Sequence, residues 1–167
     1  MQQVVLHTDG SSRGNPGPGG WGVILSYTDS AGVEHRREMS AGYALTTNNR
    51  MELMACIAGF EALSRPCKVE LHSDSQYIIN AFTQEWISGW IARGWKGSNK
   101  KPVANPDLWQ RLLAVMEPHE VSFVWVKGHA GQAENERCDA LATAAADGSD
   151  LLEDTGYIQN SKLDLGI

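Results

Sequence analysis

Apolar residues form short runs in the first half of the chain and follow helical spacing in much of the second half. Short runs bounded by Gly, Pro, Asp and Ser are typical of strands, and they predict strands at residues 4–8, 21–27, 34–43, 68–73 and 120–127. Recurrence every three to four residues predicts helices over residues 49–64, 75–83, 105–116 and 133–146. A tryptophan-rich helical stretch from residue 86 leads into a basic loop, and the Gly and Pro residues at 14–20 predict another loop.

This order of elements predicts an α/β protein with a mixed sheet, in which an antiparallel hairpin lies beside parallel strands. Residues 121–126 are apolar at both parities, as expected of a strand whose two faces are covered by helices. The chain of 167 residues, 42% hydrophobic and 20% charged, has the composition of one globular domain. We expect this domain over residues 1–150 and a loosely ordered acidic tail over residues 151–167.

No apolar run approaches the roughly 18 residues that a membrane helix needs, and the first residues lack the features of a signal peptide. We therefore expect a cytoplasmic protein without membrane contact.

The cysteines Cys56, Cys67 and Cys138 are widely spaced and form no CxxC pair, so the sequence predicts neither a disulfide framework nor a zinc site.

The net charge of −6 is unevenly distributed. Acidic residues dominate from residue 134 onward, whereas residues 86–111 carry the basic residues Arg93, Lys96, Lys100, Lys101 and Arg111 against the single acid Asp107. The tryptophans Trp86, Trp90, Trp95 and Trp109 are interleaved with these cations. Cations that pair with phosphates and rings that pack on sugars and bases are typical of nucleic-acid grooves. A core role for the tryptophans and a solvated role for the lysines is the alternative.

Two predicted strands end alike, in His7-Thr8-Asp9 and in His72-Ser73-Asp74. Ligand sites of open α/β sheets lie beyond the carboxyl ends of the strands. Each Asp could instead cap a turn, but the repetition favours a shared site for Asp9 and Asp74.

Glu52 provides a third candidate carboxylate. Helical spacing places it within the apolar stripe of residues 49–64, whereas Arg50 and Glu61 point to the opposite side. A carboxylate on a core-facing stripe is costly unless it is paired or binds a metal. The alternative is a capping box, with Asn48 or Asn49 as the N-cap.

Asp139 and His129 are further candidates. Asp139 falls to one side of the buried stripe of its helix, where a solvated role is the alternative. His129 lies between glycines, and a His near carboxylates could shuttle protons.

Clustered carboxylates without cysteine favour Mg²⁺ or Mn²⁺. Two such ions about 4 Å apart can drive phosphodiester cleavage. A zinc or iron site built on the repeated His-x-Asp ranks lower, because residues two apart in a strand are separated by nearly 7 Å; we expect His7 and His72 to be satisfied core residues.

Several motifs occur in order along the chain and together carry a family resemblance. They are Thr8-Asp9-Gly10-Ser11, Gly14-Asn15-Pro16-Gly17-Pro18-Gly19-Gly20, Thr46-Thr47-Asn48-Asn49-Arg50-Met51-Glu52-Leu53, Ser73-Asp74-Ser75-Gln76-Tyr77, Gly94-Trp95-Lys96, Trp125-Val126-Lys127-Gly128-His129-Ala130-Gly131 and Glu134-Asn135-Glu136-Arg137-Cys138-Asp139. In these motifs the chain closely resembles ribonuclease H type 1 of the bacterial kind, over about residues 4 to 157. Long motifs in a fixed order are far more specific than one short pattern.

The resemblance implies a ribonuclease H-like fold, with a five-stranded mixed sheet in the order 3-2-1-4-5 flanked by helices. It implies endonucleolytic hydrolysis of the RNA strand of RNA/DNA hybrids by two metal ions, leaving 5′-phosphate and 3′-hydroxyl ends. The ions would be Mg²⁺ or Mn²⁺, held by Asp9, Glu52, Asp74 and Asp139, and His129 would assist proton transfer or product release.

The resemblance also implies the substrate contacts. Gly14, Asn15 and Gln76 would lie along the minor groove near the RNA sugars, where the 2′-hydroxyl distinguishes RNA from DNA. Asn48 and Asn49 would touch the hybrid, Thr47 and Asn105 would hold a DNA phosphate, and Trp86 and Trp90 would line the channel of the DNA strand. The basic residues Arg93, Lys96, Lys100 and Lys101 would also bind the nucleic acid.

One departure from the family concerns Ile91 and Ala92, which stand where some members carry lysines, so hybrid affinity is expected to be lower or more sensitive to salt. Two alternative functions are a nuclease of the same superfamily that acts on DNA and a non-catalytic module that binds hybrids. Four converging carboxylates argue against the binding module, since their charges repel phosphate. The sequence indicates no obligatory protein partner, and we expect a monomer.

Overall fold

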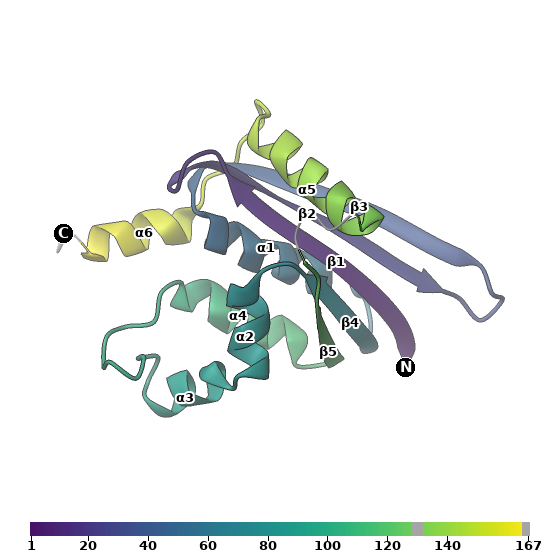
Figure 1. The fold of residues 1–167 in the computed structure, drawn as a ribbon, viewed down its shortest axis with the longest axis horizontal. Helices are drawn as coiled ribbons and strands as arrows, with labels where there is room; N and C mark the ends of the chain where they lie inside the picture. The colour runs from purple at the N-terminus through teal and green to yellow at the C-terminus, as the bar shows by residue number, and fades with distance from the viewer. Residues whose placement is uncertain (128–131, 165–167) are drawn as a thin grey trace.

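The computed structural model describes residues 1–127 and 132–164, which form a five-stranded mixed sheet with helices on both faces (Figure 1). The strands lie in the order β3-β2-β1-β4-β5. Their bounds are β1 (Gln2–Ser12), β2 (Gly17–Thr28), β3 (Glu34–Thr46), β4 (Cys67–Ser73) and β5 (Glu120–Trp125). The pairs β1–β2 and β2–β3 are antiparallel, and β1–β4 and β4–β5 are parallel. The expected sheet order is confirmed.

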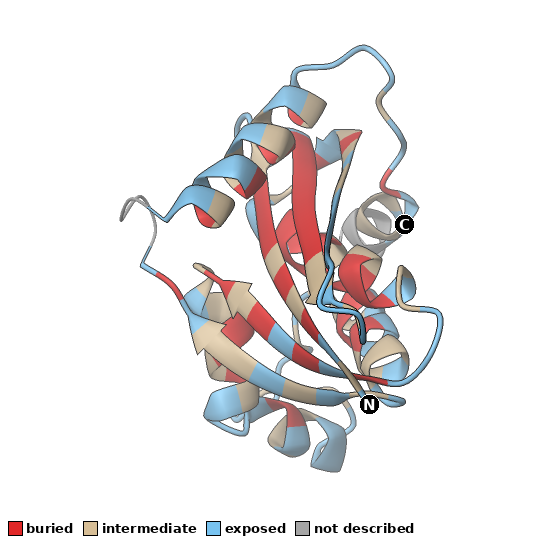
Figure 2. Ribbon diagram, turned by 90° about the vertical axis from the view of Figure 1, so that its right-hand side faces the viewer, coloured by how far each residue is buried: buried red, intermediate tan, exposed pale blue. Residues whose placement is uncertain are grey.

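The helices form unequal layers on the two faces of the sheet. Helix α1 (Asn48–Glu61) packs on β1 and β2, and α4 (Pro106–Met116) packs on α1. Helix α2 (Gln76–Thr83) contacts β5 and the short α3 (Trp86–Ala92). On the opposite face α5 (Ala133–Ala146) crosses β1, β2 and β3. Figure 2 shows buried residues concentrated along the central strands and on the helix sides turned toward them.

Glycines let both layers touch the sheet at backbone level beside Asp9. A Cβ at Gly10 would meet the backbone of Met51 and Glu52 in α1. A Cβ at Gly22, the residue paired with Asp9, would lie 2.5 Å from the carbonyl oxygen of Cys138 in α5. The two helices that carry Glu52 and Asp139 therefore approach the same point of β1 from opposite faces.

Three local expectations are wrong. Strand β1 continues past residue 8 because β2 pairs with it as far as Ser12, so Asp9 lies within a strand. Strand β2 begins at Gly17, inside the predicted loop, where it pairs with Thr46. Strand β5 is not covered on both faces: it lies at the edge of the sheet and its residues are half-buried or exposed.

The expectation of a loosely ordered tail is wrong for residues 152–157. Leu152 forms a bridge with Tyr43, and its main chain exchanges hydrogen bonds of 2.8 and 2.9 Å with Gly42 and Ala44. Asp154 is buried, accepts a 2.7 Å hydrogen bond from the Thr46 hydroxyl and precedes helix α6 (Thr155–Asp164). Backbone pairing and a buried charge hold this segment on the domain, while the boundary at residue 150 stays a prediction.

In the described part of the chain, the helices are too short or too polar to cross a membrane.

Candidate active site

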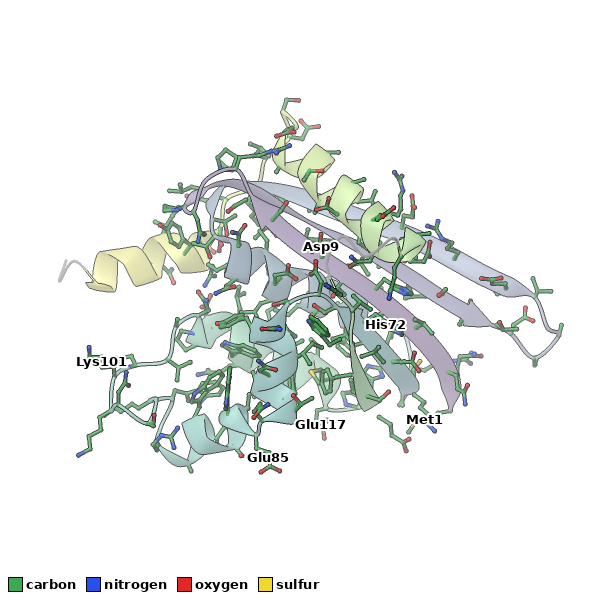
Figure 3. The ribbon with its side chains drawn as sticks, viewed as in Figure 1. Met1, Asp9, His72, Glu85, Lys101 and Glu117 are labelled. Carbon is green, nitrogen blue, oxygen red and sulfur yellow. The ribbon has the colours of Figure 1, made fainter. Side chains whose placement is uncertain are left out.

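Three carboxylates from separate elements converge where the parallel pair β1–β4 ends. Carboxylate oxygens of Asp9, Glu52 and Asp74 all lie within 4.8 Å of one another. Asp9 lies in β1 one residue beyond Thr8, the last residue paired with β4, and Asp74 directly follows β4. The structure thus brings together the first three predicted carboxylates, and Figure 3 shows Asp9 near the middle of the molecule.

Glu52 reaches this point because β1 extends beyond the end of β4. The Glu52 carboxylate accepts a hydrogen bond from the main-chain N–H of Gly10, while its Oε2 is buried and has no hydrogen-bond partner in the described part of the protein. The capping-box interpretation is wrong: Thr47 is the N-cap and accepts from the main-chain N–H of Arg50, three residues on, so Glu52 lies too far along the helix.

Asp139 supplies a fourth carboxylate beside Asp9. It projects from α5, half-buried, and both its charge and a hydrogen bond between the two carboxyl groups act on Asp9. Burial is the largest cause that raises the pKa of Asp9, followed by the charge of Asp74, and together the effects bring it to about 8. Burial, then the charges of Asp9 and Asp74, also raise the pKa of Glu52 well above its ordinary value.

A divalent cation fits this cluster. Within residues 1–127 and 132–159, no Lys or Arg forms an ion pair with Asp9, Glu52, Asp74 or Asp139. The unpartnered Glu52 Oε2 and the raised pKa values mark negative charges that lack compensation. An all-oxygen donor set suits hard cations such as Mg²⁺.

The His pair lies outside this cluster. The rings of His7 and His72 are neighbours across β1 and β4, with centroids 4.6 Å apart. His72 Nε2 lies 2.5 Å from Glu70 Oε1, but His7 Nδ1 is buried and unpartnered among the described residues, so only His72 is satisfied as expected. Across the described residues, the acidic cluster is the group suited to hold a metal.

The predicted groove contacts lie around the loop after β1 and the start of α1. Asn48 Oδ1 accepts from the main-chain N–H of Ser12 at 2.7 Å and from its hydroxyl at 2.9 Å, and the Asn48 N–H donates to Asn15 Oδ1 at 3.1 Å. These bonds tie the loop that carries Gly14 and Asn15 to the helix that carries Glu52. Gly14, Asn49 and Gln76 are exposed.

The tryptophans of the basic segment divide into two roles. Trp109 is fully buried in the core, whereas Trp86 is 42% exposed and Trp90 is half-buried against Trp95 and Trp109. Arg93 and the three lysines Lys96, Lys100 and Lys101 are exposed, and Figure 3 shows Lys101 at the outer end of the loop between α3 and α4. Arg111 instead pairs with Glu61 at 2.7 Å.

Sequence reasoning placed Arg50 on the outward side of α1, and this is wrong. Arg50 is 1% exposed, because the carboxylates of Asp107 and Asp154 surround its guanidinium group. The sequence feature that could have indicated the burial of Arg50 was Asp154, an acid in a segment expected to be loosely ordered.

His129 lies outside the described residues, so its role stays a prediction.

The sheet order and the carboxylates at the end of its central parallel pair define a nuclease of the ribonuclease H-like class. The family model for RNase H matches residues 1–147, and the chain belongs to this family. It is 61% identical over 153 residues to a ribonuclease H of Lachnoclostridium phytofermentans, a match that covers 91% of this chain and 97% of that protein. The ribonuclease H of Cronobacter sakazakii is 59% identical over 93% of this chain and 94% of its own length.

Solved structures agree with this assignment. LC9-RNase H1, a type 1 RNase H with the type 2 active-site motif, superposes with a TM-score of 0.80 and 32% identity, covering 99% of this chain and 84% of that chain. LC11-RNase H1, solved in complex with an RNA/DNA hybrid, has a TM-score of 0.61 and 27% identity over 86% of this chain and 96% of that chain.

Proposed function

We propose that this protein is an endonuclease that hydrolyses the RNA strand of RNA/DNA hybrids. Convergence of Asp9, Glu52 and Asp74 within 4.8 Å, in a chain of the RNase H family, is the observation that carries the proposal. In the reaction, a water oxygen bonds to the scissile phosphorus and the bond to the 3′ oxygen breaks. The products are a 5′-phosphate and a 3′-hydroxyl, and the water proton leaves to a base.

Asp9, Glu52, Asp74 and Asp139 would hold two divalent ions, Mg²⁺ or Mn²⁺. When bound, such ions activate the water and stabilise the leaving oxygen. The buried Glu52 Oε2 offers a preformed oxygen ligand, and the Gly10 N–H holds the same carboxylate in place. His129 would move a proton at the leaving oxygen or assist product release.

The substrate contacts proposed for this chain surround the cluster. Gly14, Asn15 and Gln76 would face the RNA sugars, Asn48 and Asn49 would touch the hybrid, and Thr47 and Asn105 would bind a DNA phosphate. The exposed Trp86 and the half-buried Trp90 would line the DNA channel. Arg93, Lys96, Lys100 and Lys101 would pair with phosphates.

We also propose that the protein acts as a cytoplasmic monomer. Size-exclusion chromatography with light scattering tests the monomeric state.

The proposal is tested by gel analysis of a hybrid labelled on either strand, incubated with Mg²⁺ or EDTA beside double-stranded DNA and RNA. We expect Mg²⁺-dependent cuts in the RNA strand of the hybrid alone, and loss of nearly all turnover in Asp9→Asn and Asp74→Asn while the fold persists. Preferential cleavage of duplex DNA, or hybrid binding without cleavage in Mg²⁺ and Mn²⁺, would overturn it.

A further inference from the structure

Arg50 joins the two residues proposed to hold a DNA phosphate. Its main-chain N–H donates to Thr47 Oγ1 at 3.3 Å, and its Nη1 donates to Asn105 Oδ1 at 3.3 Å. Thr47 caps α1 and Asn105 precedes α4, so these two residues come from separate elements. Thr47 is therefore held by the main chain of Arg50, whereas Asn105 depends on the position of the buried Arg50 side chain.

Two carboxylates fix that side chain. Asp154 accepts from Arg50 Nε at 2.7 Å and from Nη2 at 3.0 Å, and Asp107 accepts from Nη1 at 3.0 Å and from Nη2 at 2.7 Å. Asp154 also accepts from the Thr46 hydroxyl, next to Thr47. Bidentate pairing on two sides leaves the planar guanidinium one orientation.

The orientation of Arg50 determines which end of the Asn105 amide is available. A guanidinium group can only donate, so Arg50 fixes the oxygen of Asn105. The nitrogen Nδ2 then donates to the Tyr77 hydroxyl at 3.2 Å, which also accepts from Trp109 Nε1 at 2.9 Å. Asn105 has left-handed backbone angles, φ 56° and ψ 41°, and its side chain makes no capping bond to α4. One Nδ2 hydrogen therefore remains for an acceptor outside the network.

We propose that Asp154 and Arg50 are positioning residues, which hold the Asn105 amide so that it presents an N–H donor to a phosphate of the DNA strand. This inference rests on the proposed function, because it deepens the substrate contact of Thr47 and Asn105. It gives the segment after α5 a role in substrate binding: Asp154 acts on the phosphate through Arg50 and Asn105, without touching the substrate.

The test combines a protein variant with a change in the substrate. In the full chain, Asp154→Asn removes the charge and keeps the shape, and hybrids carry one neutral methylphosphonate at each DNA phosphate in turn. For the unaltered protein we expect the methylphosphonate at one DNA position to raise KM about tenfold and to leave kcat unchanged. A tenfold rise corresponds to the loss of one hydrogen bond to a charged group. For Asp154→Asn we expect a raised KM on the normal hybrid and a smaller further rise at that position, about threefold, because Thr47 still contacts the phosphate.

Asn105→Ala should behave as Asp154→Asn does, and Glu61→Gln, which breaks the surface pair with Arg111, should behave as the unaltered protein does. If Asp154→Asn does not fold at the assay temperature, Asp107→Asn weakens the second bidentate pairing of the same guanidinium group while Asp154 keeps its charge paired. If folded variants of the positioning residues still show the full, roughly tenfold rise in KM with the methylphosphonate, this inference alone is overturned. Absence of hybrid cleavage by the unaltered protein overturns the proposed function instead.

Discussion

The indole Nε1 of Trp125 donates a hydrogen bond of 3.3 Å to the main-chain carbonyl of Asp74. Asp74 follows the last residue of β4, so no ladder bond of that strand holds its peptide. Trp125 is the last residue of the edge strand β5 and is 46% exposed. An exposed tryptophan thus helps to fix a carboxylate of the active site from outside the cluster.

We expect Trp125→Phe to lower kcat several-fold with little change in thermal stability, because the ring remains and the bond to Asp74 is lost. Steady-state cleavage of a labelled hybrid and thermal unfolding measure the two effects. Trp21→Phe is the matched control, since the buried indole N–H of Trp21 has no hydrogen-bond partner among the described residues. Equal turnover of the two variants would contradict a positioning role for Trp125.

The raised pKa of Asp9, about 8, makes the metal-free protein less stable at alkaline pH. A carboxyl group whose pKa is higher in the folded state than in the unfolded state stabilises the fold at low pH, and this contribution is lost as pH rises through the folded pKa. Each excess proton bound by the folded state gives a slope of about 1.4 kcal/mol per pH unit. Urea unfolding in EDTA should therefore show stability that falls between about pH 4 and pH 8, the ordinary and the folded pKa of Asp9.

Asp9→Asn should flatten that fall, because the amide does not titrate, and Mg²⁺ should offset it in the unaltered protein by binding the folded state. Asp147→Asn serves as a control, since Asp147 is an exposed carboxylate paired with Arg13. A pH profile identical for the unaltered protein and Asp9→Asn would contradict the electrostatic account of the cluster.

Gly22→Ala should reduce stability and turnover together. Its Cβ would meet the Cys138 carbonyl oxygen, and overpacking of this kind costs about 1–3 kcal/mol. The displaced α5 would carry Asp139 away from Asp9. Denaturant unfolding measures the loss of stability, and kcat measures the loss of turnover. Gly148→Ala, where a Cβ would lie 3.3 Å from the nearest atom, should leave both nearly unchanged. An unaltered kcat in a folded Gly22→Ala protein would contradict a contribution of Asp139 to turnover.

Removal of the two outer lysines in Lys100→Ala/Lys101→Ala should raise KM without lowering kcat. If both pair with phosphates, the slope of log affinity against log salt should become shallower by about 2. Fluorescence anisotropy of a labelled hybrid across a salt series measures this slope. Lys68→Ala removes an exposed lysine at the other end of β4 and should keep the original slope.

The sequence predicted most of the sheet and the acidic cluster because both depend on local signals. Asp9 and Asp74 follow apolar runs, and Glu52 interrupts an apolar stripe. Arg50 was placed wrongly because the acids that allow its burial lie 57 and 104 residues away, a distance over which periodicity says nothing. The exposure of Trp125 was missed for a similar reason, since apolar composition does not distinguish an edge strand from a central one. For His129 the family resemblance remains the basis of the prediction.

The ion pair between Arg50 and Asp154 has a consequence for synthesis on the ribosome. The partner that completes the charge balance of Arg50 is 104 residues further along the chain, so it is made about 5–20 s later at ordinary elongation rates. Until then the guanidinium group has the Asp107 carboxylate as a partner but lacks the bonds from Nε and Nη2 to Asp154. The bonds that fix the Arg50 side chain are therefore completed late in synthesis, after Asp9, Asp74 and Asn105 have all been made.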